Sequence, residues 1–171
     1  MIEMGESLVG AYLRYANGCD MVLYNERTEA QGEIDVIGVR GGDVPEVWLC
    51  EVATHIAGLG YGADFAEMTK KIASKLERAA AFARKLFPNH LTHVEFWAPN
   101  VPVGKTTDWF TEHVESSLAS GVEVTFVINA EYTQRLQELV DLAGKDTRTP
   151  SEPAYRLLQI LTHTRGGKLS L

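Results

Sequence analysis

Two acidic side chains, Asp35 and Glu51, lie inside otherwise apolar stretches of this sequence. Asp35 belongs to the run from Ile34 to Val39 and Glu51 to the run from Val47 to Val52, and a turn that contains Gly41-Gly42 lies between them. This spacing predicts a β-hairpin. An ionised carboxylate in a half-buried strand is costly unless it is paired or binds a cation. Two carboxylates on neighbouring strands therefore suggest a site for a hard divalent metal ion.

The alternative interpretation is that each acid stands at a strand end and points into water. That interpretation suits either residue taken alone. Antiparallel pairing through a short turn brings residues near the two strand centres within a few ångströms of each other. The pair thus favours a shared site more than either acid does by itself.

The spacing of apolar residues predicts the elements that position this hairpin. Residues 4–16 form an amphipathic helix with Glu6 near its start, and Met21 to Tyr24 form a short strand. Residues 25–31 are a polar connection into the hairpin. A long helix follows from about Asp64, its expected cap, to Leu86.

The rest of the chain alternates strands and helices. The predicted elements are a strand at 93–97, a helix from Thr106 or Thr107 to about Leu118, a strand at 122–128, and helices at 130–142 and 154–163. Antiparallel strands followed by helical crossovers predict an α/β fold, a three-layer α/β/α sandwich with a central mixed sheet. We expect one domain at 1–145, with residues 146–171 as a helical extension packed on it.

Composition restricts the classes of function. A length of 171 residues with 45% hydrophobic and 23% charged residues is typical of a globular domain. No apolar run reaches the ~20 residues of a membrane span and the start MIEMGES lacks a signal-peptide pattern, so we expect a cytoplasmic protein. The net charge of −7 opposes indiscriminate binding to nucleic acid, which therefore requires a local basic patch. The isolated Cys19 and Cys50 indicate neither a zinc site nor a disulfide framework.

Three short segments together resemble a known family. Met21-Val-Leu-Tyr-Asn-Glu-Arg, then Gly32-Glu-Ile-Asp-Val-Ile-Gly, then Trp48-Leu-Cys-Glu-Val are similar to the core of the PD-(D/E)XK, or restriction-endonuclease-like, nuclease superfamily. Within it the sequence resembles predicted endonucleases related to Holliday junction resolvases. The likeness covers about the first 55 residues and, more loosely, the helix that follows.

The resemblance implies a role for each matching residue. Asp35 and Glu51 would be the acids that bind Mg²⁺ or Mn²⁺, and Val52 would add a backbone carbonyl. Glu6 on the first helix would be an auxiliary metal-binding or orienting carboxylate. The third residue of the motif departs from the family, because Ala53 stands where lysine is expected.

In some members of the superfamily the catalytic lysine has moved to the helix beside the core strands. Here Lys75 is the candidate, with Lys71 in reserve one turn earlier. At 100° per residue Lys75 lies about 60° from Ile72, at the edge of the apolar stripe. From there its stem could cover core surface while its ammonium reaches a polar pocket, although a solvated surface lysine is the alternative.

The family implies a metal-dependent endonuclease that hydrolyses phosphodiester bonds in DNA, with branched or structured DNA as one form of substrate. Related resolvases act as dimers, so a homodimer is compatible with the resemblance. Because Ala53 departs from the motif, the alternative is a catalytically inactive module that binds DNA or a partner protein. An unrelated α/β enzyme that uses these acids for proton transfer is a third interpretation.

Two further features have an ordinary and a functional interpretation. Trp97 and Trp109 could stack on bases, but tryptophans at these spacings usually belong to the core. The glycine-rich stretch 58–62 could admit a phosphate, but a plain connector is the commoner explanation.

Overall fold

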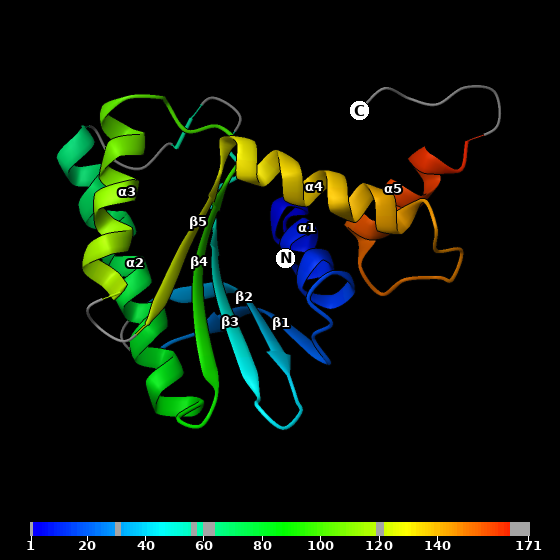
Figure 1. Ribbon diagram of the computed structural model, residues 1–171, viewed down its shortest axis with the longest axis horizontal. Helices are drawn as coiled ribbons and strands as arrows, with labels where there is room; N and C mark the ends of the chain where they lie inside the picture. Colours follow the sequence, from blue (N-terminus) through cyan, green and yellow to red (C-terminus); the bar gives the residue numbers. More distant parts are fainter. Residues whose placement is uncertain (1, 30–31, 56–57, 60–63, 119–121, 165–171) are drawn as a thin grey trace.

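A mixed sheet forms the centre of the fold (Figure 1). The structure is a computed structural model, and it describes residues 2–29, 32–55, 58–59, 64–118 and 122–164. Within these ranges the sheet has five strands in the order β1-β2-β3-β4-β5, with β1, β2 and β3 antiparallel and β3, β4 and β5 parallel. The strands are β1 (Met21–Arg27), β2 (Glu33–Arg40), β3 (Glu46–Val52), β4 (Leu91–Ala98) and β5 (Glu123–Ile128).

Helices cover both faces of the sheet, which gives the three-layer α/β/α sandwich that the sequence predicted (Figure 1). The helices are α1 (Met4–Tyr15), α2 (Phe65–Leu86), α3 (Lys105–Leu118), α4 (Asn129–Ala143) and α5 (Pro153–Thr162). The crossovers from β3 to β4 and from β4 to β5 advance in one direction, so right-handed connections place α2 and α3 on the same face. Helices α1 and α4 pack on the opposite face.

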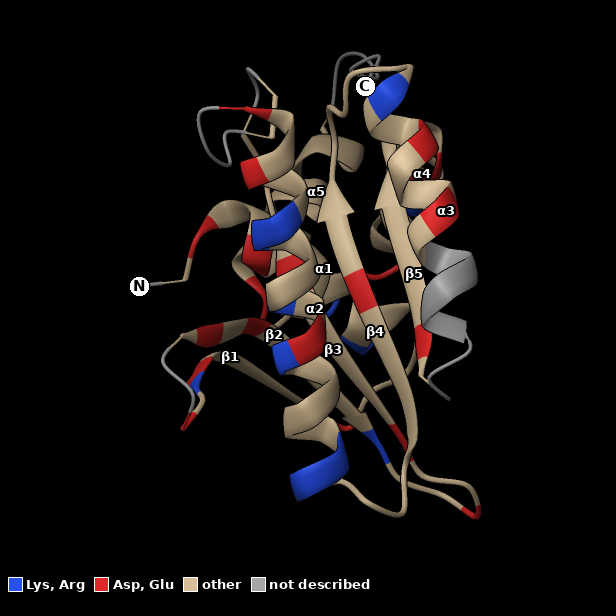
Figure 2. Cartoon of the chain, turned by 90° about the vertical axis from the view of Figure 1, so that its left-hand side faces the viewer, with Lys and Arg blue, Asp and Glu red and all other residues tan. Residues whose placement is uncertain are grey.

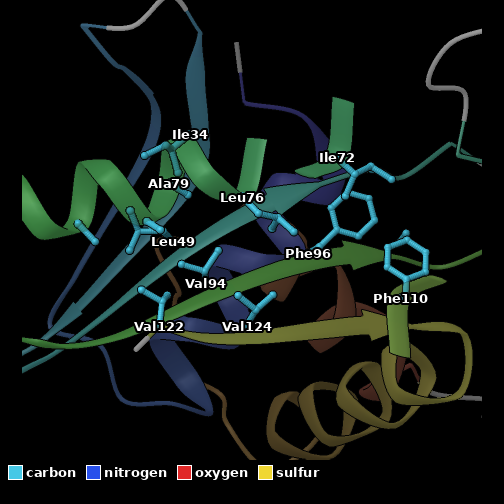
Figure 3. Packing of buried hydrophobic residues seen from close by; sticks show 14 of the residues in the cluster. Ile34, Leu49, Ile72, Leu76, Ala79, Val94, Phe96, Phe110, Val122 and Val124 are labelled. Atoms are coloured by element: carbon cyan, nitrogen blue, oxygen red, sulfur yellow. The ribbon is translucent and has the colours of Figure 1, made fainter. Parts of the chain in front are cut away.

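The larger part of the core lies between the sheet and α2. Ile72, Leu76 and Ala79 recur at helical spacing and point onto the strands, where Leu49 and Phe96 are fully buried (Figure 3). Burying a leucine or phenylalanine side chain of this kind contributes about 1.5–3 kcal/mol to stability. This packing fixes α2 against β3 and therefore fixes where its polar residues stand.

Helix α5 packs on the helices of the opposite layer. Tyr155 and Leu158 of α5 share a buried cluster with Ala11 of α1 and Leu139 of α4. The backbone N–H of Ala154 also donates to Ser7 Oγ over 3.1 Å. Helix α5 is thus tied to α1, the helix that carries Glu6.

Two local predictions were wrong. Residues 25–27 belong to β1 and are not a connection, because they continue the antiparallel pairing with β2 up to Arg27 opposite Glu33. Helix α3 begins at Lys105, and Thr107 Oγ1 is hydrogen-bonded to both the backbone N–H and the carbonyl of Gly104. Neither threonine is therefore the residue that precedes the helix.

Other local predictions were confirmed. Asp64 caps α2, since its carboxylate accepts the backbone N–H of Glu67 over 2.8 Å. Trp97 is 4% exposed and Trp109 packs against the core cluster, so both belong to the packed interior. Gly60, Tyr61 and Gly62 of the glycine-rich stretch lie outside the described residues. Every helix in the described ranges is too short or too polar to cross a lipid bilayer.

Candidate functional site

Asp35 and Glu51 face each other from adjacent strands. Val36 pairs with Cys50 in the antiparallel register, so the next residue outward on each strand, Asp35 and Glu51, stand opposite one another. Side chains alternate along a strand, and Leu49, two residues before Glu51, packs under α2. Both carboxylates therefore lie on the α2 face. Asp35 is 8% exposed and Glu51 is completely buried.

Lys75 of α2 reaches both carboxylates. Its ammonium lies 2.5 Å from Glu51 Oε2 and 3.8 Å from Asp35 Oδ2. The register of α2 explains this position, because Ile72 and Leu76 on either side of Lys75 are buried against the sheet. The stem of Lys75 runs along that apolar surface, and its charged end enters the gap between the two acids.

Lys71, the reserve candidate, does not join this cluster. Its ammonium pairs with Glu67 over 2.8 Å on the same helix, and its side chain is half exposed. Residues four apart lie above one another on a helix, so this is an ordinary surface pair. Of the two lysines, the structure brings only Lys75 to Asp35 and Glu51.

Arg78 supplies a second cation that sequence reasoning missed. Its Nη2 lies 3.5 Å from Glu51 Oε1 and donates to the backbone carbonyl of Glu33 over 3.2 Å. Gly32 makes room for it, because a Cβ at that position would lie 2.5 Å from the guanidinium. Arg78 follows Lys75 by three residues and so shares its helix face, which is the signal that could have identified it.

The two residues after Glu51 take part through the backbone and through packing. The backbone N–H of Val52 donates to Asp35 Oδ2 over 2.7 Å and so orients that carboxylate. Ala53 is 1% exposed within the core cluster, and its N–H donates to the carbonyl of Trp97. Position 53, where the motif that the sequence resembles has lysine, is therefore a packed core position in this chain, and the cation that contacts both acids is Lys75 of α2.

Glu6 lies at the edge of the site, held by two hydrogen bonds. Its Oε2 accepts from the backbone N–H of Glu3 over 2.8 Å and from Asn25 Nδ2 over 3.2 Å. The preceding residue, Gly5, lets α1 lie close to Thr54, because a Cβ at position 5 would lie 2.3 Å from the Thr54 side chain. Among the ion pairs of the described residues, Glu6 forms none with Lys75.

Asn25 is a second residue that sequence reasoning missed. It lies in β1 between the pairs Tyr24–Val36 and Glu26–Ile34, and so stands opposite Asp35. Its φ of 55° is in the left-handed region, which is unusual inside a strand. Asparagine tolerates this conformation better than most residues, and such strain clusters at functional sites. No apolar pattern could have revealed it.

Burial dominates the electrostatics of both carboxylates. Desolvation raises the pKa of Asp35, although the ammonium of Lys75 and the N–H of Val52 oppose the rise. Desolvation also raises the pKa of Glu51, with Lys75 opposing the rise and the charge of Asp35 adding to it. An additional cation between the two groups would lower both pKa values and relieve their mutual repulsion.

The side chains fit a hard divalent cation in one respect that the structure shows directly. Glu51 Oε1 is buried and accepts no hydrogen bond, so it is an acceptor with unused capacity. Across the described residues, no three His, Cys, Asp or Glu side chains are grouped closely enough to hold a metal ion alone. Mg²⁺ commonly uses one or two protein carboxylates and completes its coordination with water and substrate phosphate. Asp35 and Glu51 suit that mode of binding.

The basic side chains at the site stand among acidic ones. Figure 2 shows basic and acidic segments alternating along α2, and acidic segments on the neighbouring β1–β2 hairpin.

Comparison with protein-family models, curated proteins and solved structures found no match to this chain.

Proposed function

We propose that this chain is a metal-dependent endonuclease that hydrolyses phosphodiester bonds in DNA. One observation carries the proposal: two buried carboxylates on adjacent strands, Asp35 and Glu51, converge on the ammonium of Lys75 from the helix packed over them. Buried acids that keep raised pKa values cost stability, and such groups are characteristic of functional sites. The resemblance to the PD-(D/E)XK core also supports the proposal, because it implies a metal-binding role for the same two acids.

Each residue has a distinct part in the proposed reaction. Asp35 and Glu51 would hold Mg²⁺ or Mn²⁺, which, when bound, lowers the pKa of a coordinated water and balances charge on the phosphate. The N–H of Val52 keeps Asp35 turned toward the site. The side-chain nitrogen of Lys75, which lies between the acids, would offset the negative charge that builds on the phosphate during attack. Glu6 and Asn25 hold the adjoining end of α1 and β1 in place.

Cleavage assays on supercoiled, linear and branched DNA with Mg²⁺ or Mn²⁺ test this proposal. We expect Asp35→Asn and Glu51→Gln each to lower the cleavage rate by about 100-fold or more. Glu123→Gln is the matched control, because Glu123 is a half-exposed carboxylate that pairs with His93 at the far end of the sheet. Cleavage that survives in Asp35→Asn at the wild-type rate would overturn the proposal.

A catalytically inactive module that binds DNA or a partner protein is the second candidate. The observation that favours it is the packed Ala53 at the motif-lysine position, together with the close contact between Lys75 and Glu51. A chain that binds DNA but cleaves none of the tested forms, with either metal, would support this candidate over the nuclease.

A further inference from the structure

A groove lies between the end of β1 and the second half of α2, directly beside the carboxylate site. It has a volume of about 370 Å³ and is lined by Arg27 and Glu29 on one side and by residues of α2 on the other. Arg78 belongs both to this groove and to the contacts around Glu51. A molecule in the groove would therefore contact a side chain that also faces the buried carboxylate of Glu51.

The α2 side of the groove follows from helical spacing. Arg78, Phe82 and Lys85 recur at steps of four and three residues, so they continue the helix face that begins at Lys75. From Lys75 to Lys85 the helix rises about 15 Å. One helix face thus joins the site to the far end of the groove.

The charge of the groove differs from that of the chain. Three cations line it, against one carboxylate, while the whole chain carries a net charge of −7. Arg78 faces Glu51 and Lys85 pairs with Glu29 over 2.5 Å. That leaves Arg27 as the cation that no lining carboxylate neutralises, at the exposed end of β1. Arg27 is therefore the cation of the groove lining that a phosphate group could contact.

The groove also has an apolar wall. Phe82 is half-buried, and its inner side packs against the core cluster. Leu86 is 54% exposed beside it. An aromatic ring next to a cation is the combination on which unpaired bases stack in single-strand-binding proteins. A base paired inside a duplex keeps its flat faces covered by its neighbours, so it cannot use this wall without leaving the stack.

We propose that this groove binds an unpaired nucleotide of the DNA strand to be cut, with its phosphate near Arg27 and its base against Phe82. The volume suits a ligand of that size. Resting on the proposed nuclease function, this inference names the class of substrate: DNA with a single-stranded or unpaired nucleotide beside the scissile phosphate. A continuous duplex is the poorer ligand.

Fluorescence anisotropy in EDTA tests the inference without any cleavage. The probes are a fluorescein-labelled oligothymidylate of about 10 nucleotides and a blunt hairpin duplex, at about 50 mM salt. We expect the oligothymidylate to bind more tightly than the duplex. Phe82→Leu, which keeps the apolar packing but removes the ring, should weaken oligothymidylate binding about tenfold and leave duplex binding unchanged.

Charge variants provide a matched comparison. Arg27→Glu should weaken oligothymidylate binding at least about threefold more than Arg84→Glu, which makes the same change of charge on α2 outside the groove lining. Leu86→Glu supplies a variant at an exposed position should Phe82→Leu fail to fold, and it should weaken binding in the same direction. Thermal melting establishes that each variant is folded.

The outcomes separate this inference from the function on which it rests. Equal affinity for both probes, unchanged by Phe82→Leu, Leu86→Glu and Arg27→Glu, would overturn the groove as a nucleotide site even if the enzyme cuts DNA. Selective binding that depends on these residues, in a chain that cuts no DNA, would support the groove and overturn the nuclease.

Discussion

The Lys75 ammonium lies 2.5 Å from Glu51 Oε2, and this contact joins the helix layer to a completely buried carboxylate of the sheet. Removal of one partner from a buried ion pair leaves the other charge uncompensated, which is far more costly than loss of a surface pair. This relationship makes Lys75 important for stability as well as for the proposed chemistry.

Lys75→Met should therefore lower the free energy of unfolding by about 3 kcal/mol in metal-free buffer. Lys71→Met is the control one turn earlier on α2, where the exposed pair with Glu67 predicts a loss below about 1 kcal/mol. Urea denaturation of both variants measures the difference. Equal losses in the two variants would show that the ammonium of Lys75 does not compensate the buried acids.

The pKa values of Asp35 and Glu51 predict how stability depends on pH. Because burial raises both pKa values, each group contributes stability below its ordinary unfolded pKa and loses it as pH rises through the folded pKa. Asp35→Asn removes one of these charges, and its amide oxygen can still accept the N–H of Val52. The melting temperature of Asp35→Asn minus that of wild type, measured in EDTA, should therefore increase as the pH is raised from about 4 to about 7. A difference that shrinks with rising pH would refute this assignment of charge.

Two substitutions of Asn25 distinguish the cost of backbone strain from the loss of a hydrogen bond. Its φ of 55° is easy for glycine and costly for alanine, and both substitutions remove the amide that donates to Glu6. Asn25→Ala should consequently be less stable than Asn25→Gly by about 1 kcal/mol. Chemical denaturation of the two variants provides the comparison, and equal stabilities would mean that β1 relaxes at this residue.

The two thiols should be inert in the folded protein. Cys19 and Cys50 are 4% and 0% exposed, and burial raises the pKa of Cys19 to about 12 and that of Cys50 well above its usual range. The thiolate is the reactive form, so an aromatic disulfide reagent at about pH 8 should label both cysteines only after unfolding. Prompt labelling of the native chain would contradict this packing.

The sequence predicted the parts of the site that follow from regular periodicity. Antiparallel pairing through a short turn brought Asp35 and Glu51 close together, and helical spacing from Ile72 placed Lys75 at the edge of the core. The sandwich itself followed from the order of the elements. These predictions succeeded because burial of an apolar face determines the orientation of a strand or a helix.

The parts that were missed depend on contacts between distant segments. Asn25 lies in a polar stretch whose strand conformation comes from backbone pairing with β2, and no side-chain pattern encodes that pairing. The sequence shows Ala53 only as a departure from the motif that it resembles, and the structure shows that Ala53 is a core residue that packs beneath α2. Arg78 had the correct spacing, yet its role requires the space that Gly32 leaves for its guanidinium.

Calorimetric titration with Mn²⁺ tests the central claim most directly, because it requires no knowledge of the DNA substrate. We expect a single ion to bind each chain and Asp35→Asn and Glu51→Gln each to abolish binding, while Glu123→Gln binds as wild type does. Absence of Mn²⁺ binding to the wild-type chain, or binding that persists in either site variant, would contradict the account.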